Sequence, residues 1–514
     1  MQTRHSTNEQ TGSHRKTYLI EMAGVIVLYI FLQFCCQYYW YAVGESNGLF
    51  LYNCDYFLRS LARPAGLLAY AGAFLAQFCV LEYAGALLFT ILCYAVYKSA
   101  QVLNERLMPT FRQPFFALLL VAYTILLHID ADYHISGTLA LIGSMLLLIS
   151  YLRLDSDKAK AIFVWVIIPI CGWLMGPAII VVALCIIIIE FSADTRMLWF
   201  YLLAVPAAAL PLTYMYVQTD AETAQLTYLP DTYFYHYISP GVKVWYPWIV
   251  VVVMVAILST FNTIKVRFNI SKKILPLLTL INVVAVVIVF VVLFAVAYNA
   301  RVYDYLKVDH LRKTAQWDKL AAMKMSERTP SMAVNTYNLA LQMQGLFGEK
   351  VFIARRLGPG SLYTPYAGQP MLADLLSDIY FSQGNIAMSQ KMAMNYMLSR
   401  EDELDGRALL RLIDTNLLLG NERVAEKYIG ILEDTWHYKD EATARKTFLT
   451  DKTALGKDAR LGELSRCVPA DTAVITSVVA DLETILGANP DFKPAREFLD
   501  IYNRLLDEYN KTNE

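Results

Sequence analysis

The chain has 514 residues, of which 56% are hydrophobic and only 17% are charged. Because soluble domains carry about 25% charged residues, this composition excludes an ordinary water-soluble protein and favours a membrane class. Charged residues are rare before Asn299 and recur every few positions after Arg301. The formal net charge of -1 sums these two regimes and says little about partners. No basic aromatic stripe occurs, so nucleic-acid binding has no support.

The eight cysteines do not form a disulfide scaffold. Five of them lie in apolar segments, where cysteine behaves as a small hydrophobe. Cys54 and Cys79 share one loop and can pair only if that loop is oxidised, and Cys467 stands alone in the charged half. The sequence contains no Cys/His cluster with zinc spacing, no Walker-type phosphate loop and no Rossmann fingerprint.

Nine apolar stretches in the first 300 residues are predicted to cross a membrane, because about 20 apolar residues in a helix span the hydrocarbon core. They are Tyr18–Val43, Glu82–Tyr97, Pro114–Ile129, Ile135–Leu152, Ala161–Leu174, Ala178–Phe191, Met197–Val217, Val244–Ile264 and Ile274–Tyr298. The fifth and sixth are short and meet at Gly172–Pro177, which predicts a tight hairpin or a re-entrant pair. The first is too long for a signal peptide and is predicted to be an uncleaved anchor after a tail at 1–17.

The loops between these stretches alternate in their content of Lys and Arg. One set carries 14 such residues, and the other carries only Arg59, Arg63 and Lys243. Positive residues stay on the cytoplasmic side, so the N-terminus is predicted to be cytoplasmic in a cell inner membrane. With nine crossings, residues 300–514 form an extracytoplasmic, periplasmic domain, whereas an even number would return them to the cytoplasm.

Residues 300–514 have the period of amphipathic helices. The predicted helices are Tyr303–Ser326, Ser331–Gln344, Met371–Ser382, Ile386–Ser399, Gly406–Leu419, Glu422–Trp436, Asp471–Ile485 and Pro494–Tyr509. Gly384-Asn385 and Gly420-Asn421 are 36 residues apart, and Ser389 and Ala425 follow them at the same offset. This pattern resembles a tetratricopeptide (TPR) repeat, whose concave surface suits a protein or peptide partner. The alternative is an ordinary helical bundle. The fold class is therefore all-α.

The first loop after the first crossing, Gly44–Leu81, is long and carries candidate chemistry. Glu45 lies at the mouth of the crossing, and Asp55, Arg59 and Arg63 recur at a spacing that predicts a helix in the interface plane. The apolar side of this predicted helix comprises Leu49, Phe50, Phe57, Leu58 and Leu61, and Ala65–Phe78 is predicted to be a second interface helix. The alternative for Asp55 and Arg59 is an ion pair that only stabilises its helix.

Two further loops on the same predicted side carry polar residues. Ile129–Ser136 holds Asp130, Asp132 and His134 between apolar helices, where unpaired acids are costly and are functional candidates by default. The third loop, Gln218–Lys243, supplies the substrate-binding candidates Tyr235, His236 and Lys243. The alternatives are a solvated turn for the acids and an aromatic belt for the tyrosines.

These features resemble the GT-C integral-membrane glycosyltransferases, some of which carry TPR-like tails. The resemblance implies transfer of a sugar from a polyprenyl-phosphate carrier to an extracytoplasmic acceptor. It implies carboxylates as general base, or as ligands of a divalent metal ion, and cations for the phosphate. The implied catalytic residues are Glu45, Asp55, Asp130 and Asp132, and the implied substrate-binding residues are Arg59, Arg63, His134, Tyr235, His236 and Lys243. The paired acids usual in that family's first loop are missing here.

The chain also resembles an uncharacterised bacterial membrane family of the same layout, in the sequences FLRSLARPAGLLAYAGAFLAQF, NLALQMQG and AEKYIGILEDTWHYKDEATA. That resemblance implies no activity. The second functional hypothesis is a non-enzymatic scaffold, in which the membrane half anchors a repeat domain that gathers envelope-assembly partners. A transporter is disfavoured because the crossings lack buried charges and show no inverted repeat.

Overall fold

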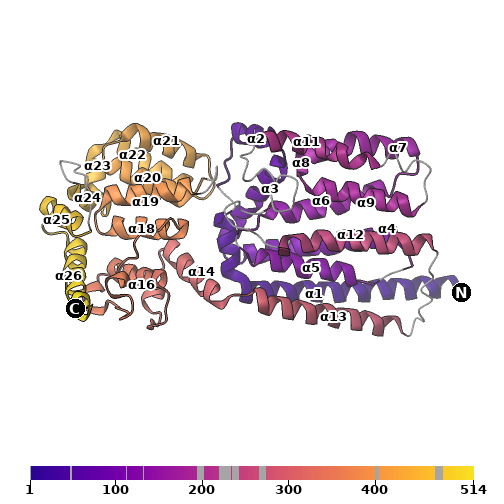
Figure 1. Cartoon of the computed structure of the whole chain (residues 1–514), viewed down its shortest axis with the longest axis horizontal. Coiled ribbons are helices and arrows are strands. Elements are labelled where there is room, and N and C mark those ends of the chain that lie inside the picture. The colour runs from indigo at the N-terminus through magenta and orange to yellow at the C-terminus, as the bar shows by residue number, and fades with distance from the viewer. Residues whose placement is uncertain are drawn as a thin grey trace. The chain divides into compact units, whose positions relative to one another are not determined.

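The computed structural model describes residues 2–46, 49–110, 113–130, 132–193, 202–218, 233, 242–264, 274–399, 404–468 and 478–513. Every regular element in these ranges is a helix, which confirms the all-helical fold class (Figure 1). The chain forms two compact units. Unit 1 comprises Met1–Asn47 and Cys54–Ala300, and unit 2 comprises Gly48–Asn53 and Arg301–Glu514.

Unit 1 is built from apolar helices joined by short connections. Its elements are α1 (Gln2–Ser46), α2 (Cys54–Leu61), α3 (Gly66–Ala76), η1 (Gln77–Val80), α4 (Ala84–Leu107), α5 (Phe115–His128), α6 (Ile135–Tyr151), α7 (Asp157–Ile162), the π-helical η2 (Phe163–Ile167), α8 (Ile168–Met175), α9 (Ala178–Ser192), α11 (Ala204–Gln218), η5 (Val242–Trp245), α12 (Tyr246–Thr263) and α13 (Leu275–Ala297). Cys54 and Cys79 are both free thiols.

Five helices of unit 1 are long and apolar enough to cross a membrane. They are Tyr18–Gly44, Ala84–Leu107, Asp157–Met175, Lys243–Thr263 and Pro276–Ala297. Shorter apolar helices cover Gly66–Val80, Phe115–His128, Ile135–Tyr151 and Ala178–Ser192. The predicted fifth crossing is one continuous helical run with a π-helical middle, and it turns into α9 at Gly176, whose φ is +75°. The seventh predicted crossing lies partly outside the described residues, which resume at 202.

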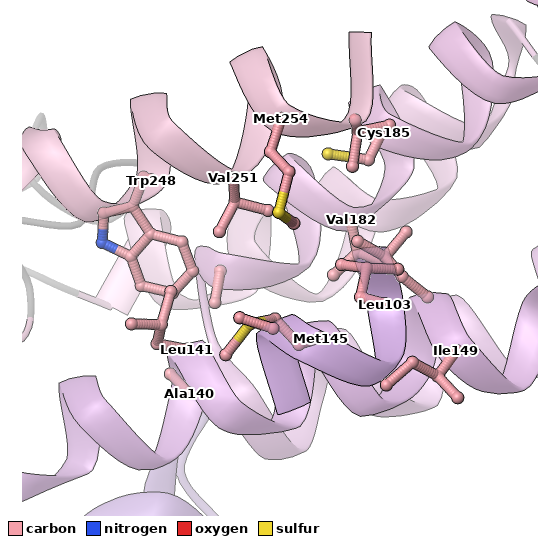
Figure 2. Close-up of a cluster of buried hydrophobic side chains, with 14 of the residues drawn as sticks. Leu103, Ala140, Leu141, Met145, Ile149, Val182, Cys185, Trp248, Val251 and Met254 are labelled. Atoms are coloured by element: carbon pink, nitrogen blue, oxygen red, sulfur yellow. The ribbon is translucent and has the colours of Figure 1, made fainter. Parts of the chain in front are cut away.

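The core of unit 1 lies where α4, α6, α9 and α12 pack side by side (Figures 1 and 2). Leu103, Met145, Val182 and Met254 contribute one buried side chain each from these four helices (Figure 2). Large apolar side chains also cover the outward faces, including those of α1 and α13. Helices with apolar outward faces are compatible with a lipid bilayer as their surroundings.

Unit 2 is a succession of short amphipathic helices. They are α14 (Ala300–Lys313), α15 (Trp317–Ala321), α16 (Ser331–Met343), α17 (Phe347–Lys350), η6 (Gly358–Ser361), α18 (Pro370–Ser382), α19 (Ile386–Leu398), α20 (Gly406–Leu418), α21 (Glu422–Glu433), α22 (Lys439–Thr450), α23 (Lys452–Lys457), α24 (Leu461–Leu464), η7 (Ser465–Cys467), α25 (Val478–Ala488) and α26 (Lys493–Asn513). The helix predicted over Tyr303–Ser326 is broken at Ala315, and α22 was not predicted. The start of the helix predicted from Asp471 lies outside the described residues.

One turn geometry recurs four times in the described part of unit 2. A residue with positive φ ends a helix at Ala315, Gly345, Gly384 and Gly420. The next backbone N–H donates to the carbonyl five residues earlier: Gln316 to Leu311 (2.8 Å), Leu346 to Leu341 (2.8 Å), Asn385 to Tyr380 (2.9 Å) and Asn421 to Asn416 (2.8 Å). This bond satisfies a carbonyl at the helix end and reverses the chain into the following helix. The Gly-Asn pairs in the sequence mark two of these turns.

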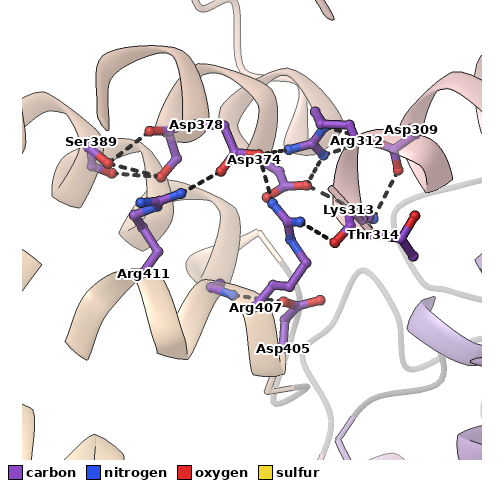
Figure 3. A network of polar contacts seen from close by, with 12 residues as sticks. Asp309, Arg312, Lys313, Thr314, Asp374, Asp378, Ser389, Asp405, Arg407 and Arg411 are labelled. Atoms are coloured by element: carbon purple, nitrogen blue, oxygen red, sulfur yellow. Dashed lines mark hydrogen bonds and ion pairs between the residues drawn. The ribbon is translucent and has the colours of Figure 1, made fainter. Parts of the chain in front are cut away.

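A buried charge network ties three helices of unit 2 together (Figure 3). Arg312 of α14, whose side chain is 1% exposed, donates to Asp309 at 2.7 Å and also pairs with Asp374 and Asp378 of α18. Arg407 and Arg411 of α20 reach the same Asp378, each at 2.7 Å. Burial by itself raises the pKa of Asp378, but the three guanidinium groups hold it well below its usual range. The carboxylate therefore stays ionised and acts as a hub.

The segment between α1 and α2 belongs to unit 2. The Leu49 N–H donates to the Leu404 carbonyl (2.9 Å), and the Tyr52 N–H donates to the Asp434 carbonyl (2.7 Å). Asn53 Nδ2 donates to the Asp434 carboxylate (2.7 Å), and Phe50 is buried. The spacing predicted that Leu49 and Phe50 belong to an interface helix, and this prediction is wrong. They pack into unit 2 because burying them there removes more apolar surface from water.

Replacing Phe50 with alanine is expected to destabilise unit 2 selectively. Phe50 is 5% exposed, and removal of a buried phenyl ring costs about 3–5 kcal/mol. The measurement is limited proteolysis of the purified full chain, with cleavage after residue 301 quantified against temperature. Phe57→Ala is the matched control, because Phe57 of α2 is 37% exposed. If the two variants resisted proteolysis equally, Phe50 would not contribute to the stability of unit 2.

Candidate functional site

The turn between α5 and α6 carries the acids that the sequence singled out. The Asp130 N–H donates to the Leu127 carbonyl, the Tyr133 N–H donates to the Asp130 carbonyl, and the Asp132 N–H reaches the Asp130 carboxylate at 3.3 Å. The Asp130 carboxylate also forms an ion pair with the ammonium of Lys243, which is 113 residues away and precedes α12. The structure therefore brings together two of the predicted site residues, one acid and one cation.

This ion pair remains accessible to solvent. The side chain of Asp130 is 26% exposed and that of Lys243 is 44% exposed. Pairs of this exposure contribute about 0–1 kcal/mol to stability, so the pair is not what holds the helices together. A lysine ammonium has three rotatable donors on a flexible stem, and it can move from a carboxylate to another anion at little cost.

Tyr233, from the sequence between α11 and α12, is bonded beside the Asp130 turn. It is the one residue of 219–241 among those described, and it is buried. Its hydroxyl donates to the Met175 carbonyl (2.6 Å) and accepts from the Ala178 N–H (3.2 Å), at the turn from α8 to α9. Its carbonyl accepts from the His134 N–H (3.0 Å). Tyr233 therefore links His134 of the second loop to the turn from α8 to α9. Tyr235 and His236 lie outside the described residues.

Glycines let the neighbouring elements approach this turn closely. A Cβ on Gly72 of α3 would lie 3.0 Å from the Ser136 nitrogen, so α3 crosses directly over the start of α6. A Cβ on Gly44, near the end of α1, would lie 3.0 Å from the Cβ of Cys79 in η1. Side chains at either position would force these elements apart. The first loop consequently packs onto the acid-bearing turn through α3, and onto α1 through η1.

Glu45 belongs to the last turn of α1, and its side chain lies outside the described residues. Tyr39, six residues earlier on the same helix, lies close enough to Asp130 for the two side chains to interact electrostatically. Six residues of α-helix rise about 9 Å, so the end of α1 and the Asp130 turn occupy the same end of unit 1. A meeting of the Glu45 and Asp130 carboxylates stays a prediction.

The candidates on α2 are exposed and do not join the pair in any described contact. Arg59 donates through Nε to the backbone carbonyl of Asp55 (3.2 Å) rather than to its carboxylate. The ion pair that was the alternative interpretation of Asp55 and Arg59 is not formed among the described residues, and a backbone contact stands in its place. The turn after α2 is held at Trp173, whose Nε1 donates to the Leu61 carbonyl (3.0 Å). The roles of Asp55, Arg59 and Arg63 stay predictions.

Beneath the turn lies a polar group that sequence reasoning missed. His128, at the end of α5, is buried, and its Nε2 lies 2.7 Å from the Thr138 hydroxyl, while its Nδ1 has no partner among the described residues. Its ring lies between those of Phe89 (4.5 Å) and Tyr133 (4.9 Å). An ionisable residue at the end of an apolar run was the available signal. Its contacts make it a support for the turn.

The described residues do not fit the divalent metal ion that the sequence allowed. In the ranges given above, no group of three or more His, Cys, Asp and Glu side chains is placed to hold a metal. The carboxylate of Asp130 is instead neutralised by Lys243. A hard divalent cation needs several oxygen ligands at one point, and these contacts provide a lysine there.

A family model matches residues 14–508 of the chain, and that family is described as a family of unknown function, DUF6057. The chain belongs to the DUF6057 family. The match covers both units and agrees with the uncharacterised-family resemblance seen in the sequence. Among curated proteins and among solved structures, no match to this DUF6057 chain is found.

Replacing Tyr233 with phenylalanine is expected to destabilise this end of the DUF6057 chain. The hydroxyl is buried, and its loss leaves the Met175 carbonyl and the Ala178 N–H unpaired, at a cost of about 1–3 kcal/mol. The measurement is the thermal midpoint of the purified protein in detergent. Tyr214→Phe is the control, because Tyr214 is 53% exposed. A midpoint unchanged in both variants would contradict the anchoring role.

Proposed function

We propose that this protein is a multi-pass membrane glycosyltransferase of GT-C type. In this proposal it moves a sugar from a polyprenyl-phosphate carrier to an acceptor on the extracytoplasmic side of the inner membrane. The observation that carries the proposal is the Asp130–Lys243 ion pair at the end of an apolar bundle, overlaid by α3 and close to the end of α1. A movable cation beside an accessible carboxylate is what transfer from a lipid phosphate needs.

The proposed reaction uses the two members of the pair in turn. The ammonium of Lys243 moves from Asp130 to the carrier phosphate, which carries one negative charge as a diester and gains a second as its bond to the sugar breaks. The freed carboxylate of Asp130, or that of Asp132 or Glu45, accepts the proton of the acceptor hydroxyl or amide. The acceptor atom bonds to the anomeric carbon as the carbon–oxygen bond to phosphate breaks. The polyprenyl phosphate leaves paired with Lys243, while Arg59, Arg63, His134, Tyr235 and His236 are assigned to substrate binding.

The membrane topology of the proposal has nine crossings, with the N-terminus in the cytoplasm and residues 301–514 in the periplasm. Lys and Arg counts supply the direction. The segment Gly48–Asn53 supplies an independent constraint, because it follows α1 directly and belongs to unit 2. In the proposal, residues 48–53 and 301–514 share one side of the membrane, so an even number of crossings separates residue 54 from residue 300. Eight further crossings satisfy that condition.

Reporter fusions test the topology without any assay of activity. Alkaline phosphatase fused after Asn47 and after Asn513 is expected to be active in both cases, and green fluorescent protein fused there is expected to be dark. A fusion in the loop after Ser192 is expected to give the reverse result, as the matched cytoplasmic control. If the fusions at Asn47 and Asn513 gave opposite results, the two sites would lie on different sides of the membrane and the proposed topology would be wrong. If all three fusions gave the reverse of the expected results, the N-terminus would not be cytoplasmic.

Transfer activity is tested with the purified protein in vesicles containing a radiolabelled polyprenyl-phosphate sugar. Asp130→Asn is expected to lower the release of polyprenyl phosphate by about 100-fold or more, since general-base catalysis contributes about 10²–10⁴. Lys243→Met should weaken carrier binding. Asp157→Asn at the exposed start of α7 is the control. The enzymatic proposal fails if the wild-type protein and Asp130→Asn consume the carrier at the same rate.

The second candidate is a non-enzymatic scaffold whose TPR-like array in unit 2 gathers envelope-assembly partners. The fourfold recurrence of one helix-ending turn favours it, since stacked helix pairs present extended surfaces for protein or peptide ligands. Under this candidate, partner capture by the full chain survives Glu45→Gln and Asp55→Asn, and no carrier is consumed.

A further inference from the structure

Two guanidinium groups lie against one buried aromatic ring in unit 2. The ring belongs to Phe381, at the end of α18, and its centroid is 3.6 Å from the guanidinium of Arg411 and 4.9 Å from that of Arg460. Arg411 is paired with Asp378. In the described part of the chain, no carboxylate lies within ion-pair distance of the Arg460 guanidinium, and none accepts a hydrogen bond from the Arg460 side chain.

The charge of Arg460 is therefore poorly compensated. Burial of part of its side chain, followed by the nearby charge of Arg411, lowers the pKa of Arg460 to about 10. The residue as a whole is nevertheless exposed, so solutes reach it. Like charges are costly to hold on one ring, and an anion beside them would relieve that cost.

Two buried donors of α20 also lack acceptors among the described residues. The Nε atoms of Arg407 and Arg411 are buried and have no hydrogen-bond partner among the described residues. These arginines are four residues apart on α20 and therefore share one face of it. Elsewhere in the same network Nε is used, since Arg312 donates through it to Asp309 at 3.3 Å. Donors left open in a network that otherwise satisfies them point to a missing acceptor.

We propose that Arg411 and Arg460, stacked on Phe381, form a binding site for an oxyanion, a phosphate or a carboxylate group of a soluble ligand. The planar guanidinium presents paired donors that match both groups in a bidentate fashion. The site is independent of the carboxylates in unit 1, and it holds whether the chain is an enzyme or a scaffold. It would recognise the charged end of an acceptor or partner molecule.

Equilibrium dialysis of the full chain in detergent tests the site. Radiolabelled inorganic phosphate and radiolabelled succinate are titrated separately, at an ionic strength held constant with sodium chloride. The wild-type protein is expected to bind one equivalent of one of them, and the arm that saturates identifies the chemistry. Arg460→Ala is expected to bind about tenfold or more weakly, since a charge-assisted hydrogen bond contributes about 1.5–3 kcal/mol.

Two further variants keep the test decisive. Arg466→Ala removes an exposed arginine of η7 and is expected to bind like the wild-type protein. Arg460→Lys keeps the positive charge but lacks the paired donors of the guanidinium, so it is expected to bind the anion more weakly than the wild type. This variant keeps the test valid even if Arg460→Ala fails to fold. The proposal is overturned if neither anion saturates the wild-type protein, or if Arg460→Lys and Arg460→Ala both bind as well as the wild type.

Discussion

The six residues Gly48–Asn53 constrain the whole molecule, because the chain enters unit 2 there and again at Arg301. Two backbone hydrogen bonds, one side-chain hydrogen bond to Asp434 and the buried side chain of Phe50 secure this segment. Under the proposed topology, every crossing between residues 54 and 300 is matched by a return, so the number of apolar helices that cross in this range has to be even.

At the Asp130 end of unit 1, chemistry depends on close packing. Gly44 and Gly72 remove the side chains that would keep η1 and α3 away from α1 and α6, and Gly176 turns the chain from α8 into α9 beside Tyr233. Tyr233 is bonded through its hydroxyl to the turn from α8 to α9 and through its carbonyl to His134 of the second loop. The described elements near the Asp130–Lys243 pair are closely packed, whereas the pair itself is accessible to solvent.

Unit 2 concentrates its charges differently. Arg312 is surrounded by carboxylates, and removing one partner from such a buried group leaves an uncompensated charge, which is costly. That part of the network is structural, because it joins α14 to α18 and α20. Arg407 and Arg411 belong to the same network, yet their Nε atoms have no acceptor among the described residues, and Arg460 lies beside Arg411 on the Phe381 ring. The proposed anion site would use these donors, whereas the carboxylates around Arg312 serve packing.

Local sequence determined the apolar half, the helical half and the boundary near residue 300, because hydropathy and helical period are properties of short windows. It also located the acids at 130 and 132 and two of the four recurring turns, since Gly-Asn pairs signal them. Other features required the tertiary structure. Lys243 meets Asp130 across 113 residues, Phe50 leaves its neighbours for another unit, and Ala315 breaks a helix without a glycine. Such pairings depend on which surfaces bury the most apolar area together, and no local window contains that comparison.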